Sequence, residues 1–333
     1  MISERNNLLI LIPFTGLLVL GLIMVSSASI FVAEDMTGDP FHFISRQMLF
    51  MAIGLMAMLF FMMIPSDFLF KSDWIFLLLS IILLLALFIP EVGTSVNGSV
   101  RWIRLGSINI QPSEICKFSL IIYISGYSVR RTLVINSFRS FLKPLILLFV
   151  IAILIMLQPD LGSTAIICLL VASILFYAGI SFFQFSVLSS VIALLGFMSI
   201  SSSSMRMARI LAFMDPFAPE VVEGSGWQLS NSLISIGQGG WFGLGLGNSF
   251  QKDRFLPEAH TDFIFAILVE ELGILGGLLL LALFVILFIG ILMVSLDSLS
   301  KGKLFQGYVS FGVLILIAAQ SLFNIAVNIG LLP

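Results

Sequence analysis

Long apolar runs recur along the whole chain, and they restrict its fold more than any other feature of the sequence. They cover residues 8–32, 45–64, 73–90, 113–129, 143–157, 163–180, 183–200, 263–296 and 304–330. Each run is about long enough to cross a hydrocarbon layer of roughly 30 Å as a helix. Apolar residues make up 59% of the 333 residues and charged residues 10%, and the mean hydropathy is +1.15. No water-soluble globular protein of this length has such a composition, so we predict a polytopic membrane protein.

The fold class follows from the length and uniformity of these runs. They are too long and too evenly apolar for the alternating strands of a membrane barrel. A helix satisfies its backbone hydrogen bonds within one segment, as lipid requires. We predict an all-α bundle of about nine transmembrane helices that forms a single integral membrane domain over residues 1–333. Cys116 and Cys168 lie inside predicted helices and indicate neither a disulfide framework nor a thiolate metal site.

The distribution of basic residues predicts the orientation of the chain. With the N-terminus in the cytoplasm, the inner segments carry eight basic and four acidic residues, a net charge of +4. The outer segments carry the other eight basic and fourteen acidic residues, a net charge of −6, so the two values add to the −2 of the whole chain. The densest basic cluster, 130–143, then lies inside, as the positive-inside rule requires. This orientation places the polar segments 91–112, 158–162 and 201–262 on the outer face.

The first outer segment contains Gly, Asn and Pro at intervals typical of a loop. Arg101, Trp102 and Arg104 are expected at the lipid interface. One interpretation is an interfacial anchor. The other is a clamp for the phosphate of a lipid head group, because the guanidinium fork matches phosphate oxygens. Both interpretations fit the pattern.

Three further charged residues follow at the starts of predicted helices. Pro112 begins a helix with Glu114 in its first turn, and Lys117 lies three residues later on the same face. This charge pair close to lipid indicates a cavity or a partner, although a structural ion pair explains the same spacing. In QPDLG, residues 158–162, Asp160 either caps the next helix or contributes to a polar site.

The third outer segment, residues 201–262, is too long for a simple connection between packed helices. Residues 205–215 predict a short amphipathic helix closed by a turn. Residues 224–250 contain many glycines, which allow tight turns and close approach of backbones. The segment lacks the strand, helix and Lys of a nucleotide-binding loop, so nucleotide binding is excluded.

The stretch FLPEAHTDFIFAILVEELG, residues 255–273, places Glu258, His260 and Asp262 at the start of one apolar helix. Glu270 is expected roughly 12 Å deeper, turned by about 80° from Asp262, and Glu271 by about 180°. At most one of the two glutamates therefore shares a face with Asp262. Asp262 either caps the helix or is a functional acid, and ionisable residues at membrane depth indicate function.

Three motifs occur here in the order found in the SEDS family of bacterial proteins for shape, elongation, division and sporulation. They are RWIRLG with QPSE and a Lys (101–117), QPDLG (158–162) and LPEAHTDFIFAILVEELG (256–273). The chain resembles this family throughout its length. The stretch 226–252, the VSSAS run at 25–29 and Ala259 resemble the cell-division branch more than the elongation branch.

The resemblance implies a peptidoglycan glycosyltransferase that polymerises lipid II into glycan strands at the outer face of the bacterial inner membrane, at the division septum. Its implied partners are a class B penicillin-binding protein that cross-links the strands, other division proteins and membrane lipid, with no nucleic acid. It implies no organic cofactor, suggests a divalent cation (Mg or Mn) without assigning ligands, and places the catalytic aspartate on Asp262. The family pattern has ten crossings and continues past NIGLLP, whereas this chain ends at Pro333.

This chemistry suits the residues. A diphosphate leaving group needs little protonation, so a single carboxylate suffices as general base in an inverting reaction, and we predict Asp262 for that role. The predicted substrate-binding residues are Arg101, Arg104, Glu114, Lys117, Asp160, Glu258 and His260. The alternatives are a lipid II flippase, for which charges along a path and inverted repeats would be expected, and a non-catalytic division scaffold.

Overall fold

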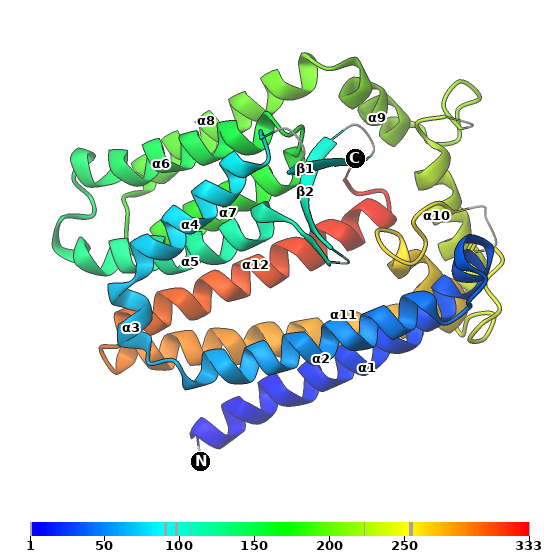
Figure 1. Cartoon of the computed structure of the whole chain (residues 1–333), viewed down its shortest axis with the longest axis horizontal. Helices are drawn as coiled ribbons and strands as arrows, with labels where there is room; N and C mark the ends of the chain where they lie inside the picture. Colours follow the sequence, from blue (N-terminus) through cyan, green and yellow to red (C-terminus); the bar gives the residue numbers. More distant parts are fainter. Residues whose placement is uncertain are drawn as a thin grey trace. The chain divides into compact units, whose positions relative to one another are not determined.

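The computed structural model describes residues 2–89, 92–96, 99–106, 108–222, 224–252 and 256–332. Figure 1 labels its helices and strands. The helices are α1 (Ile2–Thr37), α2 (His42–Met63), α3 (Ser66–Lys71), α4 (Asp73–Ala86), α5 (Pro112–Arg130), α6 (Phe138–Met156), α7 (Leu161–Tyr177), α8 (Phe182–Ser201), α9 (Ser204–Met214), α10 (Trp227–Gly239), α11 (Ile264–Ser300) and α12 (Leu304–Asn328). The strands are β1 (Gly93–Val96), β2 (Ser99–Leu105) and β3 (Ile108–Ile110).

Each predicted apolar run coincides with a helix, and the chain is a predominantly helical, multi-pass membrane protein. Among the described residues, six helices are long and apolar enough to cross a membrane, namely α1, α2, α6, α8, α11 and α12. The apolar helices α4 and α7 are shorter, with 14 and 17 residues. The nine crossings stay a prediction, as does the single domain over residues 1–333.

The chain folds as two compact units. Unit 1 comprises residues 1–63, 199–290 and 320–333, and unit 2 comprises residues 64–198 and 291–319. The helices α11 and α12 each contribute residues to both units.

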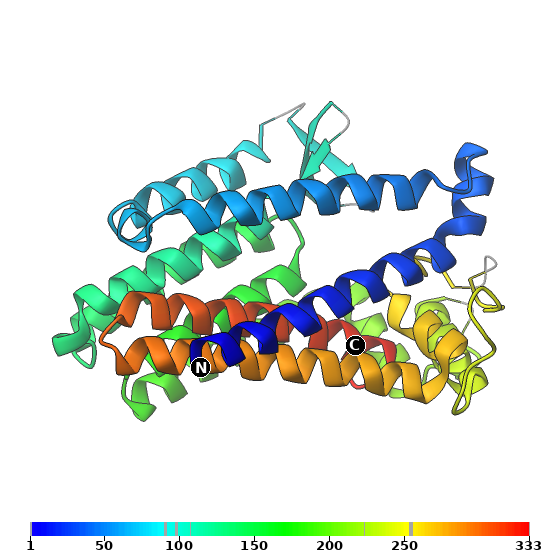
Figure 2. The ribbon, with the colours of Figure 1, turned by 90° about the horizontal axis from the view of Figure 1, so that it is seen from below.

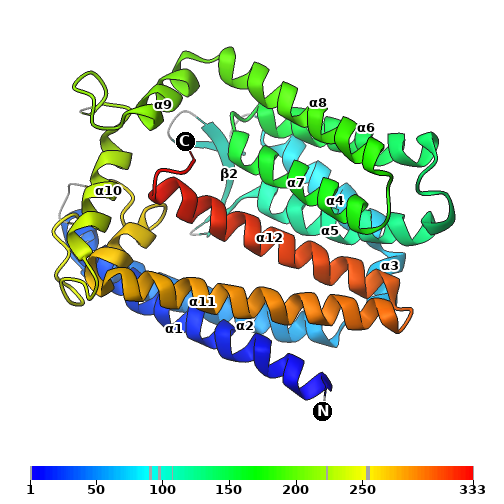
Figure 3. The same cartoon turned by 180° about the vertical axis from the view of Figure 1, so that it is seen from behind.

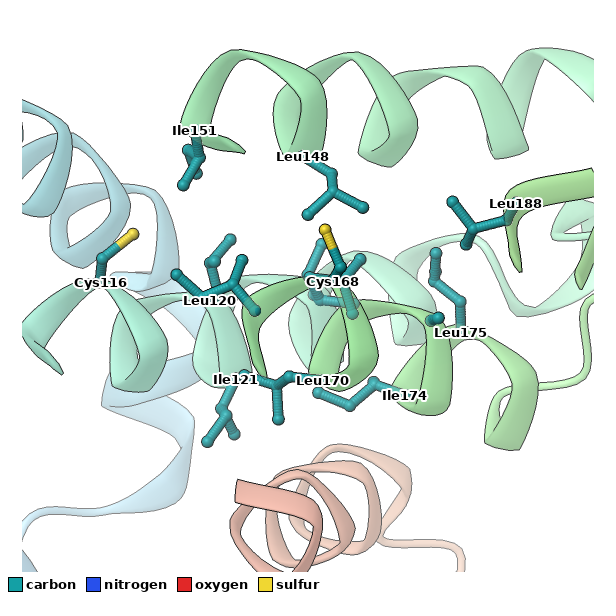
Figure 4. Close-up of a cluster of buried hydrophobic side chains, with 14 of the residues drawn as sticks. Cys116, Leu120, Ile121, Leu148, Ile151, Cys168, Leu170, Ile174, Leu175 and Leu188 are labelled. Atoms are coloured by element: carbon teal, nitrogen blue, oxygen red, sulfur yellow. The ribbon is translucent and has the colours of Figure 1, made fainter. Parts of the chain in front are cut away.

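Unit 2 is built around the apolar faces of α5, α6, α7 and α8. Figure 4 shows Leu120 of α5, Leu148 of α6 and Leu170 of α7 among the side chains of this core. These side chains are 3% exposed or less, and branched aliphatic residues of neighbouring helices fill the space between them. Cys116 and Cys168 belong to the same core as free thiols. The core fixes the ends of α5 and α7, where several predicted site residues lie.

The first outer segment was predicted to be a loop in an all-α fold, and both predictions need correction because the segment contains three β-strands. The strands β1, β2 and β3 form an antiparallel sheet in that order, with Thr94 opposite Trp102 and Arg104 opposite Asn109. The sequence contains the signals for this hairpin, because VNGSV has the Asn-Gly pair favoured in two-residue turns and VRWIRL is rich in β-branched and aromatic residues.

In unit 1, α1 packs beside α11. The helix α2 contacts α1, and Figures 1 and 2 show that the two helices lie close at the end where they are connected and diverge toward the other end. Gly16 faces Leu283, and Gly290 faces the backbone of Leu9, so small residues allow α1 and α11 to approach closely. The predicted short helix within residues 201–262 is confirmed as α9. Residues 223 and 253–255 of that segment lie outside the described residues.

The helix α11 is interrupted at Gly273, which has φ 71° and ψ −175°. The single long helix predicted for this run is therefore wrong in detail. A break inside an apolar helix leaves backbone groups without partners, and in lipid these groups need new ones. Residues 240–245 supply them. Leu244 and Gly245 donate N–H groups to the carbonyls of Glu270 and Glu271 at 2.9 and 3.0 Å. Across the break, the N–H groups of residues 274 and 275 donate to the carbonyls of residues 240 and 241.

The glycines of this segment make the approach possible. A Cβ atom on Gly239 would collide with the carbonyl of Val269, and one on Gly243 would collide with the carbonyl of Glu271. Gly243 also has a φ of 79°, in the left-handed region that favours glycine. The predicted close approach of backbones is confirmed.

We expect Gly239→Ala and Gly243→Ala each to destabilise the protein by about 1–3 kcal/mol, because the added methyl group must displace backbone. Gly237→Ala is the matched control, since Gly237 lies in the same helix as Gly239 and its Cβ would meet nothing within 4 Å. There the alanine should stabilise the helix by roughly 0.5–1 kcal/mol. Thermal unfolding in detergent measures all three, and equal midpoints for the three variants would contradict this packing.

Candidate catalytic site

Residues 256–262 precede α11 in unit 1, and apolar side chains fix them in place. Leu256 and Ala259 are 3% and 1% exposed and belong to a core cluster with Met24 and Phe263. The N–H of Leu256 donates to the carbonyl of Gln251 at 2.9 Å. The apolar residues of the segment, except Pro257, are buried. The polar residues between and after them are exposed or partly exposed.

Glu258 forms a tight turn. Its φ is 57°, in the left-handed region that is uncommon for residues other than glycine and is found at functional sites. Its carbonyl accepts the N–H groups of Thr261 and Phe263 at 3.1 and 3.2 Å. Its carboxylate accepts the Thr261 hydroxyl at 2.8 Å. The side chain of Glu258 therefore supports the turn that leads to Asp262.

Asp262 is an exposed residue whose carboxylate accepts no hydrogen bond from the described part of the chain. Among the described residues, the Asp262 carboxylate therefore does not cap α11. Although the side chain reaches solvent, the surrounding protein removes part of its hydration and raises its pKa, and the nearby charge of Glu258 raises the pKa further. A carboxylate of this kind is a stronger base than an ordinary aspartate.

The backbone of Asp262 is held firmly. Its carbonyl accepts hydrogen bonds from the Nδ2 atoms of Asn324 and Asn328, both at 2.8 Å. The sequence interpretation missed these two residues. Their signal is the spacing of two amides by four residues in NIAVN, at the end of an otherwise apolar helix.

His260 presents an unused nitrogen. Its ring packs on Phe43 of α2 with ring centroids 4.6 Å apart. Its Nδ1 is buried without a hydrogen-bond partner among the described residues. Burial lowers the pKa of His260, against a smaller opposing effect of Glu258, so the imidazole is neutral at pH 7. A neutral ring can donate a hydrogen bond from one nitrogen and accept one at the other.

Glu270 and Glu271 lie inside unit 1, each with a relative exposure of 0%. Glu271 accepts the Ser27 hydroxyl at 2.7 Å and pairs with Lys252 Nζ at 2.8 Å. Glu270 accepts hydrogen bonds from Ser235, Ser249 and the N–H groups of Phe250 and Gln251. The two glutamates therefore fix residues 249–252 on α11. Lys252 and Ser27 are further polar residues that the sequence interpretation did not assign to this cluster.

In unit 2, Arg101 and Asp160 form a second polar cluster. Arg101 donates through Nη2 to the carbonyl of Pro159 at 2.6 Å, and its Nε lies 4.0 Å from Asp160 Oδ2. Asp160 accepts the Ser163 N–H at 3.1 Å, so its interpretation as the cap of α7 is confirmed. Gln111 donates to the same carboxylate at 3.4 Å.

Lys117 is 1% exposed and pairs with Glu114 at 2.7 Å, which confirms the structural ion pair. The clamp of Arg101 and Arg104 for a lipid phosphate stays a prediction. Arg101 and Arg104 both lie in β2, and the pairing of β2 with β1 shifts register between Thr94 and Ser95, where Arg101 has no partner residue. Arg104 is exposed.

The described residues do not build a cation site of their own. Within the described ranges, no three His, Cys, Asp or Glu side chains are grouped so that they could hold a metal ion. The donor set therefore does not fit a cation held by the protein alone, and the divalent cation suggested by the sequence resemblance has no assigned ligands here.

The comparisons with known proteins identify the family. The model of the FtsW/RodA/SpoVE family, described as cell cycle protein, matches residues 7–333. The chain belongs to this family. The resemblance to the SEDS proteins is thereby confirmed, and it extends over the helices of both units.

Named relatives of this FtsW/RodA/SpoVE chain agree with that assignment. A probable peptidoglycan glycosyltransferase FtsW of Legionella pneumophila is 42% identical over 320 residues, which cover 96% of this chain and 80% of the relative. A protein of the same name from Pseudomonas fluorescens is 40% identical over 319 residues, 96% of this chain and 78% of that protein. The division branch is therefore well represented among the relatives.

Solved structures show the same fold. A chain from a peptidoglycan synthase complex that coordinates polymerization and crosslinking has a TM-score of 0.75 and 22% identity, over 95% of this chain and 87% of that chain. The rod shape determining protein RodA of Thermus thermophilus has a TM-score of 0.67 and 21% identity, over 95% and 83%. The predicted roles of Asp262 and of the binding residues stay predictions.

The raised pKa of Asp262 predicts how stability depends on pH. In the folded state its ionised form is disfavoured, so above the usual aspartate pKa of about 3.9 the wild-type chain loses stability as the pH rises through the raised value. Asp262→Asn removes this effect. We expect the variant to unfold at a higher temperature than the wild type at pH 7 and to lose that advantage near pH 4, as thermal unfolding in detergent would measure. An advantage that is constant with pH would contradict the raised pKa.

Proposed function

We propose that this chain is a peptidoglycan glycosyltransferase that polymerises lipid II into glycan strands at the outer face of the bacterial inner membrane, during septal wall synthesis. The observation that carries the proposal is the carboxylate of Asp262, which precedes α11, is exposed, and has no hydrogen-bond or ion-pair partner among the described residues. The names of the relatives, probable peptidoglycan glycosyltransferase FtsW, support the reaction and its place in cell division.

In this reaction, Asp262 is the general base. An acceptor sugar hydroxyl gives its proton to the carboxylate, and its oxygen forms the new bond to the anomeric carbon of a lipid-linked donor. The bond between that carbon and the diphosphate breaks, and the diphosphate leaves with the electron pair. Attack from the opposite face converts an α-linked donor into a β-linked product. The raised pKa of Asp262 makes it a better proton acceptor than an ordinary aspartate.

The neighbouring residues of unit 1 have supporting roles in this proposal. Glu258 fixes the turn and raises the pKa of Asp262. His260 offers its unpaired Nδ1 to a hydroxyl of the acceptor sugar. Both therefore hold the acceptor or the base, as the sequence predicts.

The cationic residues of unit 2 are proposed to bind the donor. Arg101, Arg104 and Lys117 would neutralise the diphosphate, which makes it a better leaving group. Asp160 orients Arg101, and Glu114 holds Lys117 in place. A Mg²⁺ or Mn²⁺ ion accompanying the diphosphate belongs to the proposal through the family resemblance, and no step here depends on it.

The proposed topology and partner follow the same reasoning. Nine crossings with a cytoplasmic N-terminus would place residues 91–112, 158–162 and 201–262 outside, where lipid II is polymerised. The proposed partner is a class B penicillin-binding protein, together with other division proteins. The similarity in fold to a chain of a synthase complex that coordinates polymerization and crosslinking supports such a pairing.

The decisive experiment uses the purified protein with a class B penicillin-binding partner and labelled lipid II in detergent, where no second leaflet exists. We expect glycan ladders from the wild type. Asp262→Asn should reduce their formation by roughly 10²–10⁴-fold, because the proton acceptor is lost. Asp215→Asn is the matched control, since Asp215 is exposed and, among the described residues, its carboxylate accepts only the N–H of Phe217.

Three results would contradict the proposal in different ways. Unchanged ladders from Asp262→Asn would remove Asp262 from the role of base. Wild-type protein that makes no ladders but moves lipid II across vesicle membranes would indicate a transporter. Normal septation in cells that carry only Asp262→Ala would indicate a scaffold.

A further inference from the structure

The side chain of Asn328 makes two contacts at the start of α11. Its Nδ2 donates to the carbonyl of Asp262 at 2.8 Å, and its Oδ1 accepts the N–H of Ala266 at 3.1 Å. Asn328 is the last residue of α12 and has a relative exposure of 0%. One buried carboxamide from another helix thus links Asp262, two residues before α11, to the first turn of α11.

This contact replaces a local helix cap. The first N–H groups of a helix have no partner within the helix, and an Asp close to the helix start commonly accepts one of them. Ala266 is the third residue of α11, where a capping carboxylate normally bonds. Because Asn328 Oδ1 already accepts that N–H, the cap does not need the carboxylate of Asp262.

Two more hydrogen bonds stabilise Asn328 and the Asp262 carbonyl that it binds. Asn324, one turn earlier in α12, donates to the same Asp262 carbonyl at 2.8 Å. The carbonyl of Asn328 accepts the hydroxyl of Ser232 at 2.8 Å, which ties it to α10. Figure 3 shows these parts of unit 1, with α10 and the C-terminal end of α12 labelled or marked. The backbone carbonyl of Asp262 is therefore bound by two side chains of α12, and the end of α12 is in turn bound to α10.

We propose that Asn328, assisted by Asn324, is a positioning residue for the reaction: it caps α11 in place of Asp262 and so keeps the Asp262 carboxylate free to accept the substrate proton. This inference rests on the proposed function. It assigns a catalytic consequence to a residue that does not touch the reacting atoms.

The charges around Asp262 set the direction of the expected effect. Glu258, on the same segment, raises the pKa of Asp262, whereas the α12 side chains that contact Asp262 are uncharged amides. The Ala266 N–H contacts the carbonyl of Phe263 at 3.1 Å as well as Asn328 Oδ1 at 3.1 Å. Without Asn328, it would keep only the Phe263 carbonyl, and we expect the nearby Asp262 carboxylate to take the place of the lost acceptor. A hydrogen bond from a backbone N–H stabilises the ionised form, so the pKa of Asp262 would fall and the base would be weaker and displaced.

The test measures glycan synthesis from lipid II as a function of pH, with purified protein and its penicillin-binding partner. Asn328→Leu should lower kcat by about 100-fold, because the base is displaced, with little change in KM. The acid limb of its pH profile should move to lower pH. Asn328→Asp retains an acceptor for the Ala266 N–H and adds a negative charge, so its acid limb should not move to lower pH.

Asn231→Leu is the matched control. Asn231 is also a buried Asn in a helix of unit 1, and within the described ranges its Nδ2 donates only to the carbonyl of Trp227 in its own helix. Its kcat and acid limb should match the wild type. Asn324→Leu removes one donor to Asp262 but leaves the cap, so kcat should fall roughly tenfold, the worth of one hydrogen bond, without a shift of the acid limb.

Equal losses of activity in Asn328→Leu and Asn328→Asp, without a shift of the acid limb, would show that Asn328 only packs, and would overturn the proposal. If Asn328→Leu does not fold, Asn324→Leu decides, and an unchanged kcat in that variant overturns the proposal. Failure of the proposed function is distinguishable from failure of this inference. It would appear as full activity of the Asp262→Asn variant, independent of the results for the Asn328 variants.

Discussion

The structure of unit 1 depends on the need to satisfy backbone groups where α11 is interrupted at Gly273. Gly273 is buried, so the backbone groups freed by the interruption need partners within the protein. Residues 240–245 meet this need with their own N–H and carbonyl groups, and glycines let their backbone come close enough. The acids Glu270 and Glu271, directly before the break, then bind the next residues, 249–252. A polar segment is thus fixed against a membrane helix without a large core of its own.

The same stretch of chain uses its acids in two different ways. Glu270 and Glu271 are buried and fully engaged, so they contribute order, and removing one partner would leave a buried charge uncompensated. Asp262 is exposed and unpaired among the described residues, and it contributes reactivity. Asp262 can take a different role because other groups, above all Asn328, bind the backbone at the start of α11. A carboxylate committed to capping its own helix would be a weaker base.

Much of the fold can be predicted from the sequence, because apolar runs long enough to cross a membrane form helices in nearly all cases. The break at Gly273 did not follow, since one glycine in a long apolar run carries no sign of the distant segment that repairs the helix. The sheet of residues 93–110 was missed although Asn97-Gly98 signals a hairpin. For the site, motif spacing indicates Asp262, Asp160 and Lys117. The positions of Asn324 and Asn328 beside Asp262 depend on tertiary packing between helices far apart in sequence, which a local pattern does not contain.

The central claim is that Asp262 carries a free carboxylate of raised pKa while the start of α11 is satisfied by other side chains. Its most direct test is a pH titration of the carboxyl bands by infrared difference spectroscopy, with Asp262→Asn protein subtracted to isolate one residue. The account predicts a single carboxyl group, absent from the variant, that titrates above the usual aspartate value of about 3.9. A group that titrates at or below that value would show a carboxylate already bound by hydrogen-bond donors and would contradict the account.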